Sequence, residues 1–240
     1  MSRYYPFELH CHTFHSDGSM SPQRLVERAV EREYAGIAIT DHNTVSGAEK
    51  VYSEGKLKGL TVLNGIEWTT FYGHIVCISD RQILDWRELS KENIDEKLKF
   101  AHENGAIVTL AHPRRMGAPF CIGCHLEFPI TRFEYVTAME VWSQKDSPFN
   151  PGNVSAVKFY DSLLTKGYRI TAVYGYDWHG EDKNFYNFYR TFLGGKDEKS
   201  AKEALIKGDT YISLGVEISA EIDGKKLKFG SEIPCGKRRF

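Results

Sequence analysis

Short apolar runs alternate with longer segments of helical periodicity along most of the chain. The first apolar run, residues 6–10, leads into a histidine cluster, and residues 36–40 form the second. Between these runs, residues 21–35 carry apolar side chains at helical spacing. Ser21 and Pro22 are typical of an N-cap followed by the first position of a helix. The pattern therefore predicts strand, helix, strand at the start of the chain.

The same alternation continues to the last quarter of the sequence. The further strands predicted are 60–69, 73–79, 106–113, 138–142 and 169–180, and the further helices are 44–58, 92–105, 154–167 and 200–208. Residues 209–230 look like a small antiparallel tail, and residues 113–137 form a long irregular stretch suited to an active-site loop. Repeated strand and helix predict an α/β fold with a largely parallel sheet. A β/α barrel is favoured over a doubly wound open sheet.

Composition and charge narrow the class of protein. The chain has 240 residues, of which 41% are hydrophobic and 26% charged, as in ordinary globular proteins. It has no apolar run of about 18 residues and no apolar region typical of a secretory signal at its start, so we expect no membrane span and a cytoplasmic location. A net charge of −1 argues against a long nucleic-acid track. Five irregularly spaced cysteines fit reduced thiols better than a disulfide framework.

Ligand-type side chains gather where the predicted strands end. They are His10 and His12, Asp41 and His42, Glu67, His112, and Asp177 and His179. The carboxyl ends of strands carry the site in β/α barrels and open α/β sheets, so these side chains are expected to converge. Imidazole and carboxylate suit zinc, iron or manganese. The set is large enough for two or three ions, and a carboxylate such as Glu67 would bridge two of them.

A second motif, "CIGCH" at residues 121–125, matches the pattern of covalent haem attachment. We expect no haem, because that chemistry belongs to an exported and mainly helical context. Zinc binding by Cys121, Cys124 and His125 is an alternative, but no fourth ligand is evident. The interpretation we favour is two free thiols in a loop.

Several of these motifs together resemble a known family. They are "LHCHTFHSDGSMSP", "GIAITDHNTV", "NGIEWT", "GHIV", "LAHPRR" and "YGYDWHG", in this order from residue 9 to about residue 180. The chain is similar to the PHP-domain (polymerase and histidinol phosphatase) metal-dependent phosphoesterases. The resemblance implies a distorted (βα)7 barrel with a short C-terminal β extension. We expect the barrel in residues 1–195, and the last helix and tail in residues 196–240 packed on it as part of a single domain.

The resemblance also implies a centre of two or three divalent metal ions, which would be zinc, iron or manganese. The implied ligands are His10, His12, Glu67 and Asp177 for one ion, Glu67, His74 and His112 for a second, and Asp17, His42 and His179 for a third. Glu67 would bridge the first two ions. Each of these positions carries a side chain able to bind a metal.

These features predict an enzyme that hydrolyses a small phosphate ester, such as a nucleotide, sugar phosphate or short oligonucleotide, through a metal-bridging hydroxide. Arg114 or Arg115 would bind the phosphate. Asp41 would orient a ligand histidine or move protons.

Two alternatives stay open. The first is a hydrolase of carbamates, phosphotriesters or C–N bonds on the same centre. Enzymes of the amidohydrolase type usually bridge their metals with a carbamylated lysine. The corresponding strand end here is Glu67, which favours the resemblance to the PHP-domain family. The second alternative is a non-catalytic metal-binding PHP module.

Overall fold

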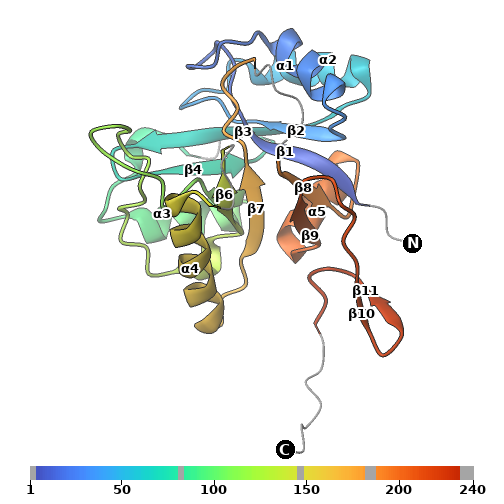
Figure 1. The fold of residues 1–240 in the computed structure, drawn as a ribbon. Helices are drawn as coiled ribbons and strands as arrows, with labels where there is room; N and C mark the ends of the chain where they lie inside the picture. Colours follow the sequence, from blue (N-terminus) through green and yellow to red (C-terminus); the bar gives the residue numbers. More distant parts are fainter. Residues whose placement is uncertain (1–3, 81–83, 145–148, 182–187, 233–240) are drawn as a thin grey trace, which may run out of the picture.

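The computed structural model describes residues 4–80, 84–144, 149–181 and 188–232, and shows an α/β fold built around one large sheet (Figure 1). The strands of this sheet are β1 (Tyr5–Cys11), β2 (Gly36–Ile39), β3 (Thr61–Thr70), β4 (Gly73–Ile78), β5 (Ile107–Leu110), β6 (Ala138–Ser143), β7 (Thr171–Gly175), β8 (Arg190–Leu193) and β9 (Thr210–Ser213). The helices are α1 (Pro22–Glu31), α2 (Ala48–Lys58), α3 (Ile94–Glu103), α4 (Pro151–Thr165) and α5 (Glu198–Lys207), with short 3-10 turns at η1 (Trp86–Glu88) and η2 (Phe133–Tyr135). No described helix combines the length and apolar character needed to cross a bilayer.

The sheet is nearly closed, as predicted for a barrel. Its strand order is β7-β6-β5-β4-β3-β2-β1-β8-β9. Strands β4 and β8 run antiparallel to both of their neighbours, and the other pairs are parallel. The two end strands of the sheet approach each other where the hydroxyl of Thr210 on β9 donates to the carbonyl of Ala172 on β7, at 3.3 Å. The barrel is thus distorted by two reversed strands.

The sequence patterns located most elements within a few residues. The hydroxyl of Ser21 caps α1 by accepting from the N–H of Arg24 at 3.1 Å, as predicted. Strand β8 was not predicted, and β9 lies in the main sheet beside β8 and not in the tail. The separate tail hairpin consists only of β10 (Ala220–Ile222) and β11 (Lys225–Leu227). Four-residue strands such as β8 and β9 are too short to show a clear period, so their pairing depends on tertiary contacts.

Apolar packing leaves one end of the barrel free for chemistry. Apolar side chains of the strands, including Phe7 on β1 and Leu193 on β8, share one buried cluster with Ala201 and Leu205 of α5. Thr171, at the first residue of β7, donates its hydroxyl to the Leu205 carbonyl at 2.7 Å, so α5 covers the end where that strand begins. Helices α1 and α2 cover β1 and β2 on one side, while α3 and α4 lie on the other (Figure 1). The carboxyl ends of the parallel strands are left to carry the polar residues.

Candidate metal centre

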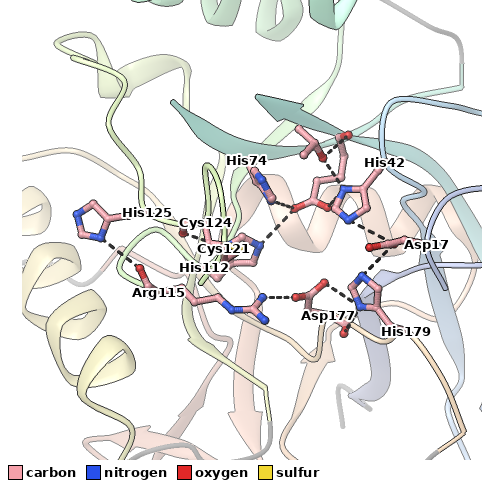
Figure 2. Close-up of a disulfide and its surroundings, with 12 residues drawn as sticks. Asp17, His42, His74, His112, Arg115, Cys121, Cys124, His125, Asp177 and His179 are labelled. Atoms are coloured by element: carbon pink, nitrogen blue, oxygen red, sulfur yellow. Dashed lines mark hydrogen bonds and ion pairs between the residues drawn. A yellow bond between two sulfur atoms is a disulfide. The ribbon is translucent and has the colours of Figure 1, made fainter. Parts of the chain in front are cut away.

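The nine side chains predicted as ligands come together in one cluster beyond the strand ends. Figure 2 labels Asp17, His42, His74, His112, Asp177 and His179 of this cluster. Potential ligand atoms lie within 4.8 Å of one another in four overlapping sets: His10, His12, Glu67 and Asp177; His42, Glu67 and His74; His12, Asp17, His42 and His179; and His74, His112 and Cys124. Residues far apart in sequence meet here because each one follows a different strand. The first and third sets contain the ligand groups implied for two of the ions.

The set of His10, His12, Glu67 and Asp177, called here the inner group, is buried. His10 Nε2 lies 3.3 Å from Glu67 Oε2 and 3.4 Å from Asp177 Oδ1, and His12 Nε2 lies 3.2 Å from the same Asp177 oxygen. His10 Nε2, His12 Nε2 and Asp177 Oδ1 are buried and make no hydrogen bond of good geometry within the described residues. Buried polar atoms without partners are costly. Their convergence on one point therefore fits a cation-binding site.

Glu67 occupies the centre of the cluster. One of its carboxylate oxygens lies 2.7 Å from His42 Nδ1, and the other lies 3.1 Å from His74 Nδ1 and 3.3 Å from His112 Nε2. The first oxygen also faces His10. A carboxylate with two oxygens directed to different histidines has the geometry of a bridging ligand.

The set of Asp17, His42 and His179, called here the outer group, is more open to solvent. Asp17 Oδ1 lies 3.1 Å from His179 Nε2 and 3.5 Å from His42 Nε2. The side chains of Asp17, His179 and His42 are 59%, 34% and 20% exposed, respectively. The outer group therefore forms the solvent-exposed side of the cluster, called here the mouth of the site.

Burial and opposite charge compete in setting the pKa values of the inner group. Burial acts to lower the pKa of His10, but the carboxylates of Glu67, Glu140 and Asp177 raise it well above its usual value. Burial also acts to raise the pKa of Glu67, and the neighbouring histidines bring it well below its usual range. For His12 burial prevails, and its pKa falls to about 4. His12 is therefore neutral at neutral pH, the form that binds metals.

Glu140, in the middle of β6, was missed by the sequence reasoning. One oxygen accepts from His10 Nδ1 and the other from the backbone N–H of His112, both at 2.7 Å. The bond to Nδ1 fixes the His10 ring so that its Nε2 faces Glu67 and Asp177. The space for Glu140 depends on Gly175, where an added Cβ would lie 2.1 Å from the carboxylate. A glutamate within the apolar strand "AMEVW" was the available signal.

Asp41 lies beside the cluster and holds the loop that follows β1. Its carboxylate accepts from the backbone N–H and hydroxyl of Thr13 and from the hydroxyl of Ser16, each at 2.7 Å. This loop runs between His12 and Asp17. The hydrogen bonds of Asp41 within the described residues thus orient a ligand-bearing loop, and the predicted bond to a histidine ring is not among them.

The two predicted phosphate-binding arginines point in different directions. Arg115 pairs with Asp177 at the mouth (Figure 2) and lines a cavity of about 430 Å³ together with Tyr176 and His179. The guanidinium of Arg114 lies 4.2 Å from the ring centre of Phe159 on α4. The structure therefore brings Arg115 to the cluster and places Arg114 against a helix.

The expectation of two free thiols in "CIGCH" is wrong. Cys121 and Cys124 form a disulfide. Gly123 makes the turn possible, because its φ of +73° favours glycine, and the two Cα atoms lie 5.4 Å apart. Cys11 and Cys77 are free and buried. The fifth cysteine, at position 235, lies outside the described residues.

A nearly closed α/β sheet with imidazoles and carboxylates converging beyond its strand ends defines a class of metal-binding barrel proteins. The chain belongs to the PHP domain family, whose match covers residues 8–202. That range includes all nine predicted ligands and ends within α5.

Relatives with described activities match only parts of this chain. A 5'-3' exoribonuclease from Haemophilus influenzae is 36% identical over 64 residues, which are 27% of this chain and 23% of that protein. A 3',5'-nucleoside bisphosphate phosphatase from Chromobacterium violaceum is 34% identical over 73 residues, covering 29% and 26% of the two chains. The aligned part is thus about a quarter of the length of each relative.

A solved structure supports the fold over a larger part of the chain. It is a two-domain protein from Bacteroides vulgatus that contains a predicted PHP-like metal-dependent phosphoesterase. The TM-score is 0.65 at 18% identity, with 88% of this chain and 65% of that chain covered. At this identity the similarity concerns the fold alone.

Proposed function

We propose that this protein is a metal-dependent phosphoesterase that acts on nucleotides or short oligonucleotides, with divalent ions held by the nine clustered residues. The observation that carries the proposal is the inner group, in which His10 Nε2, His12 Nε2 and Asp177 Oδ1 converge in a buried place and make no hydrogen bond of good geometry within the described residues. Zinc, iron or manganese suits such a set, and two or three such ions in the cluster would activate water and offset charge on a phosphate.

Each part of the protein has a separate task in this proposal. Glu140 holds the His10 ring in position, and Asp41 holds the loop that carries Asp17. Arg115, next to the cluster, is placed to bind an anionic oxygen of the substrate. Asp177 has one oxygen paired with Arg115 and the other directed to the inner group, so it would join the metal site to the arginine.

Exposed apolar side chains on the surrounding loops favour a substrate with a base. Phe14 lies between His12 and Asp17 in sequence, Phe71 lies in the β3–β4 hairpin, and Phe120 lies in the loop after Arg115; all three are exposed. Aromatic rings stack on nucleobases with little dependence on their sequence. The names of the two relatives refer to RNA and to a nucleoside bisphosphate, and both of these contain a base. These features support nucleotides over sugar phosphates.

The test is a comparison of substrates with and without a base, using protein reconstituted separately with zinc, iron(II) and manganese. We expect phosphate release from nucleoside monophosphates, bisphosphates or 5'-phosphorylated oligonucleotides, with kcat/KM at least about tenfold above that for ribose 5-phosphate, because stacking contributes about 1–3 kcal/mol per base. Phe120→Ala should reduce that advantage. Leu57→Ala, at an exposed apolar position on α2, is the matched control and should not.

Equal rates with nucleotides and ribose 5-phosphate would contradict the base-binding part of the proposal. Hydrolysis of neutral carbamates in preference to every phosphate ester would contradict the phosphoesterase assignment. Full metal loading without hydrolysis of any of these esters would favour a non-catalytic metal-binding module.

A further inference from the structure

The disulfide between Cys121 and Cys124 lies directly beside the metal-ligand cluster (Figure 2). The Cys124 sulfur and one ring nitrogen from each of His74 and His112 lie within 4.8 Å of one another. All three residues are buried. The sulfur of a residue in the irregular loop thus reaches the same space as two predicted ligands of the second ion.

The rings of both histidines are oriented toward such a site. His112 Nδ1 donates to the Cys124 carbonyl at 3.3 Å, which leaves Nε2 directed to Glu67. His74 Nδ1 faces Glu67, whereas its Nε2 is buried with no hydrogen-bond partner among the described residues. Since His74 is 6% exposed, water does not compensate this nitrogen well. His74 Nε2 therefore needs a partner on the side away from Glu67.

The C-x-x-C turn closes that side. A Cβ added to Gly123 would lie 3.2 Å from His74 Nε2 and 1.9 Å from the carbonyl oxygen of Thr70. Only a residue without a side chain permits the turn to pack this closely against the β3–β4 hairpin. The turn thus lies against the unpartnered nitrogen of His74, and Cys124 follows Gly123 directly in this turn.

We propose that Cys124 is a redox-controlled metal ligand, which binds an ion together with His74 and His112 when the Cys121–Cys124 disulfide is reduced. This inference rests on the proposed metal centre and adds a regulatory element to it. Thiolate and imidazole together suit zinc, and a sulfur already bonded to Cys121 is not available as a thiolate. Formation of the disulfide should therefore weaken binding of this ion and leave the inner group intact.

The redox step balances with an ordinary dithiol as reductant. A thiolate of the reductant attacks the S–S bond, forms a mixed disulfide, and its second thiol closes to a cyclic disulfide. Two electrons pass to the protein, and Cys121 and Cys124 become thiols. Cys124 then releases its proton to solvent as its sulfur binds the metal.

The test is a cobalt(II) titration of metal-free full-length protein, followed by near-ultraviolet and visible absorption. The reduced protein should show a thiolate-to-cobalt charge-transfer band in addition to the visible bands of bound cobalt. The disulfide form and Cys124→Ser should lack the charge-transfer band but keep visible bands from histidine and carboxylate ligation. Cys121→Ser is the matched control, because it also prevents the disulfide but keeps the Cys124 sulfur, and it should show the band with or without oxidant.

Zinc competition gives a second readout. Reduction should tighten zinc at the site of His74, His112 and Cys124 at least about tenfold, as expected for a direct ligand when outer partners alone change affinity by 10–100-fold. Visible cobalt bands without a charge-transfer band in the reduced protein would overturn this inference while leaving the metal centre standing. A charge-transfer band that persists in Cys124→Ser would assign the ligand to another cysteine and overturn it too. Absence of all cobalt bands would instead contradict the proposed centre.

Discussion

The inner and outer groups of the cluster use similar residues in very different surroundings. In the inner group, Asp177 is 4% exposed and contacts His10 and His12, and the His10 ring is fixed by Glu140. In the outer group, Asp17 is 59% exposed and lies on a loop. Burial excludes competing water and strengthens charge interactions. The comparison suggests an inner ion that is held firmly and an outer ion that exchanges readily.

Glu67 links the two groups, so its substitution should have the largest effect. Glu67→Gln keeps the side-chain shape but removes the charge that faces His10 and His42. We expect kcat to fall at least about a hundredfold, since a ligand shared by two ions should exceed the 10–100-fold effect of an outer partner. Turnover of the most active phosphate substrate measures the loss. Circular dichroism should stay unchanged, and near-normal turnover would show that Glu67 does not bridge.

Substitutions of Arg115 test whether the exposed side of the cluster binds the phosphate of the substrate. A charge-assisted hydrogen bond contributes about 1.5–3 kcal/mol, so Arg115→Ala should lower kcat/KM for phosphate esters roughly ten- to hundredfold. Arg115→Lys should have a smaller effect, because lysine lacks the planar fork. Neutral esters should lose much less, and metal content should stay constant. Arg114→Ala is the control, since Arg114 lies on Phe159. Equal losses for Arg114→Ala and Arg115→Ala would argue against a specific phosphate contact.

Asp177→Asn and Asp17→Asn compare the two groups directly. We expect Asp177→Asn to weaken the tightest ion at least about tenfold, because it removes a buried charge in contact with both inner histidines. Asp17→Asn should affect only the weakest ion. Chelator competition with elemental analysis provides the measurement. The reverse order of effects would mean that burial does not determine which ion is held firmly.

A smaller effect is expected for Glu8, a buried carboxyl below the inner group. Burial raises its pKa to about 8, from an ordinary value of 4.5, although it accepts from the backbone N–H groups of Tyr176 and His10 at 2.8 and 3.1 Å. Because the folded state binds this proton more tightly, its contribution to stability is complete below pH 4.5 and is lost as the pH rises through 8.

Glu8→Gln keeps an acceptor oxygen and cannot ionise, so it should remove that loss. Thermal unfolding at pH 6 and pH 9, in one metal state, should show a smaller decrease in Tm for the variant than for the parent. Each kcal/mol corresponds to about 2–4 °C in a chain of this size. Exposed Glu49→Gln is the control and should follow the parent. An identical decrease in parent and Glu8→Gln would refute the raised pKa.

The sequence predicted the parts of the site that depend on strand ends. His10, His12 and Asp177 follow apolar runs, and the period of a strand places the first two on one face. Residues that support the ligands by hydrogen bonds depend on three-dimensional packing, and strand patterns did not predict them. Glu140 interrupts an apolar strand and gave only a weak signal, although it supports two of the ligands.

The loop after β5 was the least predictable region. The C-x-x-C spacing permits a haem site, a zinc site, free thiols or a disulfide, and spacing alone does not distinguish them. Gly123 and its contact with Thr70 select the observed turn, and this contact joins residues from separate strands and loops. Likewise the different directions of Arg114 and Arg115 follow from the packing of α4, which adjacent positions in sequence do not reveal.

The most direct test of the central claim is the number of metal ions bound per chain. Protein purified without chelators and reconstituted in turn with zinc, iron(II) or manganese should be passed through a desalting column and its metals measured by elemental analysis. The account predicts at least about two ions per chain for the best metal, as expected for a multinuclear centre. Less than about one ion per chain with every metal, in protein that is fully folded, would contradict it.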